Sequence, residues 1–191
     1  MALYAYVRRA KEADQAEAAV RGFLEFVREK RLGFGHRENR DRLRSFILSA
    51  FQDYLDAERR PDGPMDPSFD FRAAERWFTA ERFGDTPAET TFHRAWARCI
   101  LTQSTAALSR ELAVQVGEEP ARVITAELSP LARRPFNPDL VPKLSLSPSD
   151  LLDLLKSARR RLRVLLLDTI RETVSAQSEV EVEFWDLFKS V

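Results

Sequence analysis

The sequence predicts an all-α fold made of two small helical domains joined by a proline-rich linker. Apolar residues recur at spacings of three and four through most of the 191 residues, the pattern of helices with one buried face. The alternation typical of strands is limited to the range 180–184, where the start of a helix is the better interpretation. The prolines of the range 61–67 (PDGPMDP) cannot continue a helix, and they separate two well-patterned halves.

Composition and charge indicate a globular protein. Apolar residues make up 44% and charged residues 31%, and the formal net charge is zero. Zero net charge argues against a protein that coats nucleic acid along its whole surface, but it allows local basic patches. The single cysteine, Cys99, excludes an intramolecular disulfide, and neither a membrane-spanning run nor a secretory signal is found. We therefore expect a cytoplasmic protein with no membrane partner.

Three helices are expected in the first half, over the ranges 2–11, 15–31 and 43–55. Four arginines crowd the start of the third helix: Arg37, Arg40, Arg42 and Arg44. Cations at a helix start oppose the macrodipole, at a cost of a few tenths to about 1 kcal/mol each. They either serve a purpose other than stability or are ordinary solvated surface arginines.

The range 73–82 is expected to form a short helix, and a long helix is expected up to about residue 116. The long helix begins with the signal Thr86-Pro87-Ala88-Glu89, a cap followed by a first-turn proline and an acid. Prolines then divide the range 117–148 into short pieces, with helices predicted over 121–128 and 138–144.

The clearest helix signal covers the range 147–173. Ser147 is the predicted cap, followed by Pro148 and Asp150, and leucines and other apolar residues line one face. Five cations lie between the apolar positions: Lys156, Arg159, Arg160, Arg161 and Arg163. With the 138–144 helix before it, this helix fits the second position of a helix-turn-helix. The alternative is an ordinary bundle helix with a solvated basic face.

A terminal helix is predicted from a capping box at Ser178 and Glu181, with an apolar stripe at Val180, Phe184, Leu187 and Phe188. Organised catalytic chemistry is not apparent. His36 and His93 do not pair at metal-ligand spacing, and there is no CxxC, phosphate loop or nucleophile elbow. We expect a protein that is not an enzyme, with no metal, cofactor or small-molecule substrate.

Several stretches resemble a group of extracytoplasmic-function-type sigma factors of the sigma-70 family. These are RLRSFILSAFQDYLDAERR at 42–60, FHRAWARCIL at 92–101, the capped helix with its RRRLR ending at 159–163, and the 170–188 tail. The resemblance is collinear from about Tyr4 to the C-terminus. It implies a region 2-like helical domain at 1–60, a linker with a short helix at 61–85, and a region 4-like helix-turn-helix domain with a C-terminal helix at 86–191.

The resemblance further implies that the protein binds core RNA polymerase and directs it to promoter DNA. The residues implied to bind polymerase are Arg21, Phe26, Arg40, Arg44 and Ile47. Those implied to contact the −10 strand are Tyr54, Arg59 and Arg60. Ser149, Asp150, Leu152, Asp153, Lys156 and Ser157 are implied to face the major groove, with Arg159, Arg160 and Arg163 on phosphate.

Departures from the family pattern leave a second interpretation open. The linker replaces a basic family segment after region 2, and Asp150, Leu152 and Asp153 stand where the family carries other residue types. The chain is then either a sigma factor or a degenerate sigma-like adaptor that binds a regulatory protein without reading DNA. A second apolar row, Leu152, Val164 and Leu167, predicts an inhibitory anti-sigma-type partner or cover by the tail.

Overall fold

The computed structural model describes residues 1–29, 42–57, 70–81, 83–128, 144 and 147–189. Every element of regular secondary structure in these ranges is a helix, which confirms the predicted all-α class. Within the same ranges, no helix is both long and apolar enough to cross a membrane.

The chain forms two compact units. Unit 1 comprises Met1–Cys99 together with the C-terminal segment from Thr173, and unit 2 comprises Ile100–Glu172. The expected domain ranges, 1–60 and 86–191, do not coincide with these units. One long helix contributes to both units, and the C-terminal segment belongs with the first half of the chain rather than with the capped helix before it.

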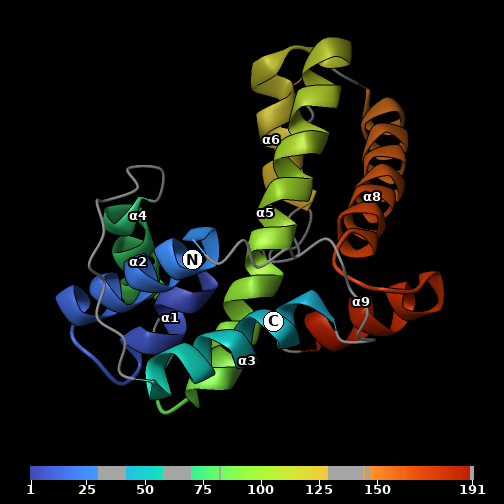
Figure 1. The fold of residues 1–191 in the computed structure, drawn as a ribbon. Helices are drawn as coiled ribbons and strands as arrows, with labels where there is room; N and C mark the ends of the chain where they lie inside the picture. Colours follow the sequence, from blue (N-terminus) through green and yellow to red (C-terminus); the bar gives the residue numbers. More distant parts are fainter. Residues whose placement is uncertain (30–41, 58–69, 82, 129–143, 145–146, 190–191) are drawn as a thin grey trace. The chain divides into compact units, whose positions relative to one another are not determined.

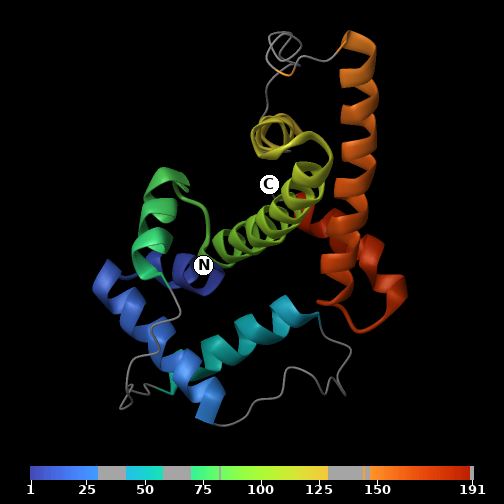
Figure 2. The ribbon, with the colours of Figure 1, turned by 90° about the horizontal axis from the view of Figure 1, so that it is seen from above.

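Unit 1 contains α1 (Ala2–Arg8), α2 (Ala13–Glu29), α3 (Leu43–Asp56), α4 (Phe71–Glu81) and the first part of α5 (Ala88–Val116), as Figures 1 and 2 show. These bounds agree with the predicted ranges to within a few residues at each end, as expected when apolar periodicity dominates.

Aromatic rings fill the core of unit 1. The Phe23 ring lies 4.9 Å from that of Phe51 and 5.6 Å from that of Tyr54, and all three residues are buried. The α1 residues Tyr4 and Val7 close the same cluster. Aromatic pairs in these tilted and edge-on geometries stabilise the fold by about 0.5–1.5 kcal/mol each beyond the burial of their area.

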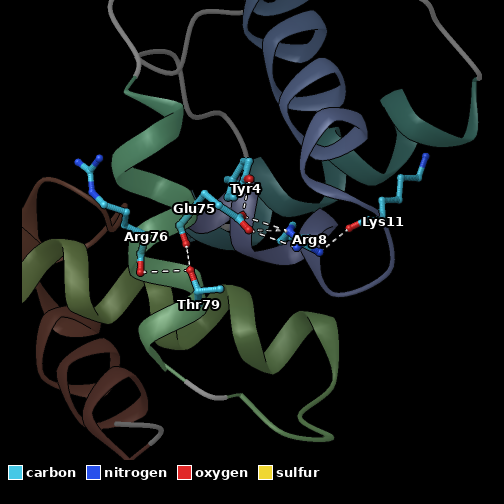
Figure 3. A network of polar contacts seen from close by, with 6 residues as sticks. All are labelled: Tyr4, Arg8, Lys11, Glu75, Arg76 and Thr79. Carbon is cyan, nitrogen blue, oxygen red and sulfur yellow. Dashed lines mark hydrogen bonds and ion pairs between the residues drawn. The ribbon is translucent and has the colours of Figure 1, made fainter.

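A polar network joins α1 to α4 beside this core (Figure 3). The Tyr4 hydroxyl donates to Glu75 Oε2 at 2.6 Å, and Arg8 Nε lies 3.1 Å from the same oxygen. The Arg8 guanidinium also lies 5.4 Å from the centre of the Phe78 ring. Burial by itself would raise the pKa of Glu75, but the hydrogen bonds from Arg8 and Tyr4 outweigh it and lower that pKa. Both groups therefore hold a charged carboxylate in place.

The C-terminal segment, defined here as Thr173–Lys189, contains a 3-10 turn η1 (Gln177–Glu179) followed by α9 (Val180–Phe188). The capping box predicted at Ser178 and Glu181 is wrong. The Ala176 amide donates to Glu179 Oε2 at 3.1 Å, so the acid that closes the turn lies two residues earlier. The predicted stripe holds, since Val180 and Leu187 are buried while Phe184 and Phe188 are partly buried.

Unit 2 contains the second part of α5, α6 (Glu118–Leu128) and α8 (Pro148–Arg171), and both ribbon views show α6 and α8 alongside α5. Gly117, with φ at 88°, separates α5 from α6 in a conformation that favours glycine. The buried residues of α8 are those of its predicted apolar face: Leu151, Leu155, Ala158, Leu162, Leu166 and Ile170. The first helix expected for the helix-turn-helix, 138–144, lies outside the described residues except for Leu144, which is helical.

Candidate nucleic-acid interface

The start of α8 is fixed by its cap, as predicted. Ser147 Oγ accepts a hydrogen bond from the Asp150 amide at 3.2 Å, and Pro148 occupies the first turn. The same hydroxyl donates to Asp150 Oδ2 at 2.6 Å, so this carboxylate turns back onto the cap. A serine cap of this kind stabilises a helix by about 1 kcal/mol.

The face of α8 beside its buried stripe is basic over the middle two turns of the helix. The side chains there that belong to the predicted site are all exposed: Ser149, Asp153, Lys156, Ser157, Arg159, Arg160 and Arg163. Helical spacing brings the four cations of this set together on one side of the helix. We call Lys156, Arg159, Arg160 and Arg163 the basic face of α8.

Not every cation of α8 belongs to this face. Arg161 Nη2 lies 2.6 Å from Glu111 Oε1 on α5, and hydrogen bonds from Arg161 lower the pKa of Glu111. Lys156 Nζ lies 3.1 Å from Asp153 Oδ1, which partly neutralises the first cation of the basic face. Among the described residues, no ion pair is recorded for Arg159 or Arg160.

This arrangement suits phosphate better than base edges. Arginine guanidinium groups bind phosphate oxygens through two parallel hydrogen bonds. The first turns of α8, which a recognition helix presents to base edges, carry Ser149 and Asp153 together with Leu152, which is 47% exposed. Asp153 repels phosphate, although a carboxylate can accept from a cytosine amine.

The first-half residues implied to bind polymerase have different surroundings. Arg21 pairs with Glu17 and lies over the Phe71 ring at 5.4 Å, while Phe26 lies 5.6 Å from the Tyr54 ring. Ile47 is half-buried on α3. Arg40, Arg59 and Arg60 lie outside the described residues.

Two implied site residues are buried, contrary to expectation. Tyr54 is 5% exposed because it continues the apolar stripe of α3 into the aromatic core, so its ring is not offered to DNA. Arg44 is 8% exposed and faces the interior of unit 1 instead of solvent. Its Nε lies 2.6 Å from Glu183 Oε1 of α9, and its Nη1 lies 3.0 Å from His93 Nδ1 of α5.

A second set of contacts joins the C-terminal segment to the start of α3. Arg42 Nη1 lies 2.9 Å from Glu183 Oε2 and also bonds Asp186. The Leu43 amide, one of the donors that a helix start leaves unpaired, donates to the Thr173 carbonyl at 2.9 Å. The hydrogen bond from Arg42 lowers the pKa of Asp186, and burial followed by the Arg44 cation lowers the pKa of His93.

Glu183 is the residue that the sequence interpretation missed. It is 0% exposed, and it lies three residues after Val180 and four before Leu187, on the apolar stripe of α9. An acid on an apolar stripe is expected to have a buried cation as partner, since an unpaired buried charge is costly. Its partners are Arg42 and Arg44, two of the arginines that the sequence places at the start of α3.

Within the part of the chain that the structure describes, no group of three or more histidine, cysteine, aspartate or glutamate side chains is arranged to hold a metal ion. Comparison with known proteins finds no family model, no curated protein and no solved structure that matches this chain.

Proposed function

We propose that this chain is a sigma-type transcription initiation factor, which binds core RNA polymerase and directs it to promoter DNA. The observation that carries the proposal is the basic face of α8, a set of exposed cations on a helix whose start is fixed by a serine cap. Its support from sequence is the collinear resemblance of four separate stretches to extracytoplasmic-function-type sigma factors.

In this proposal the parts of α8 have separate tasks. Arg159, Arg160 and Arg163 bind phosphates and so fix the position of the helix on the duplex. The side chains of the first turns, Ser149, Asp153 and Ser157, meet base edges, where Asp153 favours cytosine over the other bases. The protein performs no covalent step, needs no cofactor and acts in the cytoplasm.

Polymerase binding is assigned to unit 1, through α2 and α3. Arg21, Phe26 and Ile47 are partly exposed, so part of each side chain can meet a partner. Arg44 needs a change of its surroundings before it can contribute, because Glu183 now neutralises it.

The second candidate is a degenerate sigma-like adaptor that binds a regulatory protein without reading DNA. One observation favours it: α8 exposes two large apolar side chains besides its cations, Leu152 and Val164, which are 47% and 45% exposed. Protein–DNA interfaces are more polar than protein–protein interfaces, so exposed apolar side chains on α8 suit a protein partner better than DNA. An anti-sigma-type inhibitor that covers α8 would fit both candidates.

Co-purification with core RNA polymerase tests the proposal. The full chain, tagged and expressed with core polymerase, is expected to retain the polymerase through washing at moderate salt. A tagged helical protein of similar size and zero net charge is the control. Failure of the chain to retain polymerase, with purified components at micromolar concentration, would remove the main support for a role in transcription.

Promoter-dependent transcription separates the two candidates, since only a sigma factor supports it.

A change of Leu152 and Leu167 to serine tests for the inhibitory partner. It is expected to release an inhibitory protein while helicity stays unchanged. Melting of unit 2 in this variant would instead show that the apolar row belongs to the core.

A further inference from the structure

The contacts between the C-terminal segment and α3 suggest a function of their own. Arg42 and Arg44 lie at the start of α3. We call the surface formed by their two side chains the Arg42–Arg44 face. In the structure this face is occupied by two carboxylates of α9, those of Glu183 and Asp186. The contacts from the two arginines to Glu183 measure 2.6 to 3.1 Å. The occupant is thus an acidic helix with an apolar stripe.

We propose that α9 is an intramolecular competitor, which occupies the Arg42–Arg44 face in the free protein and must leave before an acidic segment of core polymerase binds there. The inference rests on the proposed function. It identifies the surface of unit 1 that polymerase uses and the chemistry of the segment that it offers, which is carboxylates beside apolar residues.

Three observations distinguish α9 from an ordinary core helix. It is short, nine residues from Val180 to Phe188. It exposes two large apolar side chains to solvent, Val182 and Trp185, which are 51% and 55% exposed. Apart from its buried side chains Val180 and Leu187, the polar contacts described for the C-terminal segment run to one short stretch of α3: ion pairs to Arg42 and Arg44, and a backbone hydrogen bond from Leu43 to Thr173.

The energetics allow the competitor to leave. A buried ion pair is costly to break when one partner stays buried and unpaired. Here departure of α9 carries Glu183 into solvent and also exposes the side of the Arg44 guanidinium that Glu183 now contacts. Local opening of this kind is an equilibrium that is separate from global unfolding. An incoming acidic segment restores a partner to both arginines, and therefore competes directly with α9.

The variant Glu183→Gln tests the proposal in the full chain. It removes the charge that neutralises Arg44 while the side chain keeps its size. Glu181→Gln is the matched control, because Glu181 is an exposed acid on the same helix and no ion pair is recorded for it among the described residues. Amide hydrogen exchange reports opening of α9, with α2 as the internal reference for the fold of unit 1.

We expect Glu183→Gln to accelerate exchange in α9 by at least about tenfold, with α2 unchanged. Affinity for purified core polymerase should rise by the same factor, because only the open form binds and its population increases. Glu181→Gln should change neither quantity.

Several results would overturn the proposal. One is an unchanged exchange rate in α9, and another is faster exchange in α9 with measurable but unchanged polymerase affinity. Loss of protection in α2 together with α9 would mean that α9 is part of the core and cannot act as a separable competitor. If the wild type, Glu183→Gln and Glu181→Gln all failed to bind polymerase, the proposed function would be overturned as well. An affinity that is measurable but unchanged would overturn only the role of α9.

Discussion

Arg44 shows how one side chain can change the interpretation of a helix. From the sequence it belongs to a crowd of arginines that oppose the macrodipole of α3, and the resemblance implies an outward, polymerase-facing role. In the structure its guanidinium bonds Glu183 at 2.6 and 3.1 Å and is nearly excluded from solvent. The unfavourable position is explained for Arg42 and Arg44, because both pair with acids of α9, a helix distant in sequence.

Reversal of the charge at Arg44 is therefore expected to destabilise the protein. Arg44→Glu places two carboxylates against one another in a buried site, and we expect a loss of about 3–5 kcal/mol in the free energy of unfolding. Urea denaturation measures it. The control Arg28→Glu, on an exposed position in the last turn of α2, should cost at most about 1 kcal/mol. Equal costs for the two variants would mean that the ion pair with Glu183 contributes nothing.

His93 gives unit 1 a dependence on pH. Burial and the Arg44 cation lower its pKa from the ordinary value of 6.5, although Glu89 and Glu183 act in the opposite direction. The unfolded chain then binds a proton at a higher pH than the folded chain does. Stability is fully present above pH 6.5 and is lost as the pH falls through that value toward the lowered pKa.

The variant His93→Gln tests this dependence. Its amide oxygen can accept from Arg44 but does not titrate. The decrease in melting temperature between about pH 7 and pH 5.5 should be smaller in the variant than in the wild type. Carboxylates of lowered pKa, such as Asp186, titrate below this window, so they do not obscure the comparison. An identical decrease in both proteins would exclude His93 as its source.

At the scale of the element, α8 was the most predictable part of the chain. Its cap, its first-turn proline and its buried face all follow from local sequence, because side chains three and four residues apart must share a side of the helix. The helix bounds elsewhere follow for the same reason.

Long-range pairing was much less predictable. Periodicity shows that α9 has an apolar side, but it does not say which helix that side meets, so the Arg44–Glu183 pair and the composition of the two units were missed. Tyr54 was assigned both to an apolar stripe and to DNA, and burial decided in favour of the stripe. Part of the implied site, including Arg40, Arg59 and Arg60, falls outside the described residues.

The cap of α8 can be tested by substitution. Ser147→Ala removes the acceptor for the Asp150 amide, and we expect a loss of about 1 kcal/mol in the free energy of unfolding. Ser157→Ala, at an exposed position within the same helix, should change that free energy by no more than about 0.5 kcal/mol. Thermal unfolding followed by circular dichroism distinguishes them. Equal effects would indicate that the serine does not cap the helix in solution.

The basic face of α8 makes a separate prediction about salt. Neutralisation of two phosphate contacts by Arg159→Ala and Arg160→Ala should reduce the slope of log affinity against log salt by about 2 for duplex DNA. Arg122→Ala, an exposed arginine of α6 in the same unit, is the control and should leave the slope unchanged. A slope unaffected by the α8 double variant would mean that its arginines do not meet phosphate.

At the scale of the whole molecule, the two units have separate tasks under the proposed function. Unit 2 carries the basic face of α8, and unit 1 carries the surface assigned to polymerase. Because the C-terminal segment returns to unit 1, the chain crosses between the units twice, near residues 99 and 172.

Reconstituted transcription tests the central claim most directly. Purified core polymerase, the full chain and a library of fragments from the source genome are incubated, and the start sites of the transcripts are sequenced. The account predicts start sites that depend on the chain, share a common upstream sequence, and are lost with the Arg159→Ala and Arg160→Ala double variant but kept with Arg122→Ala. Transcripts that are the same with and without the chain, although it is bound to polymerase, would contradict the assignment as a sigma-type factor.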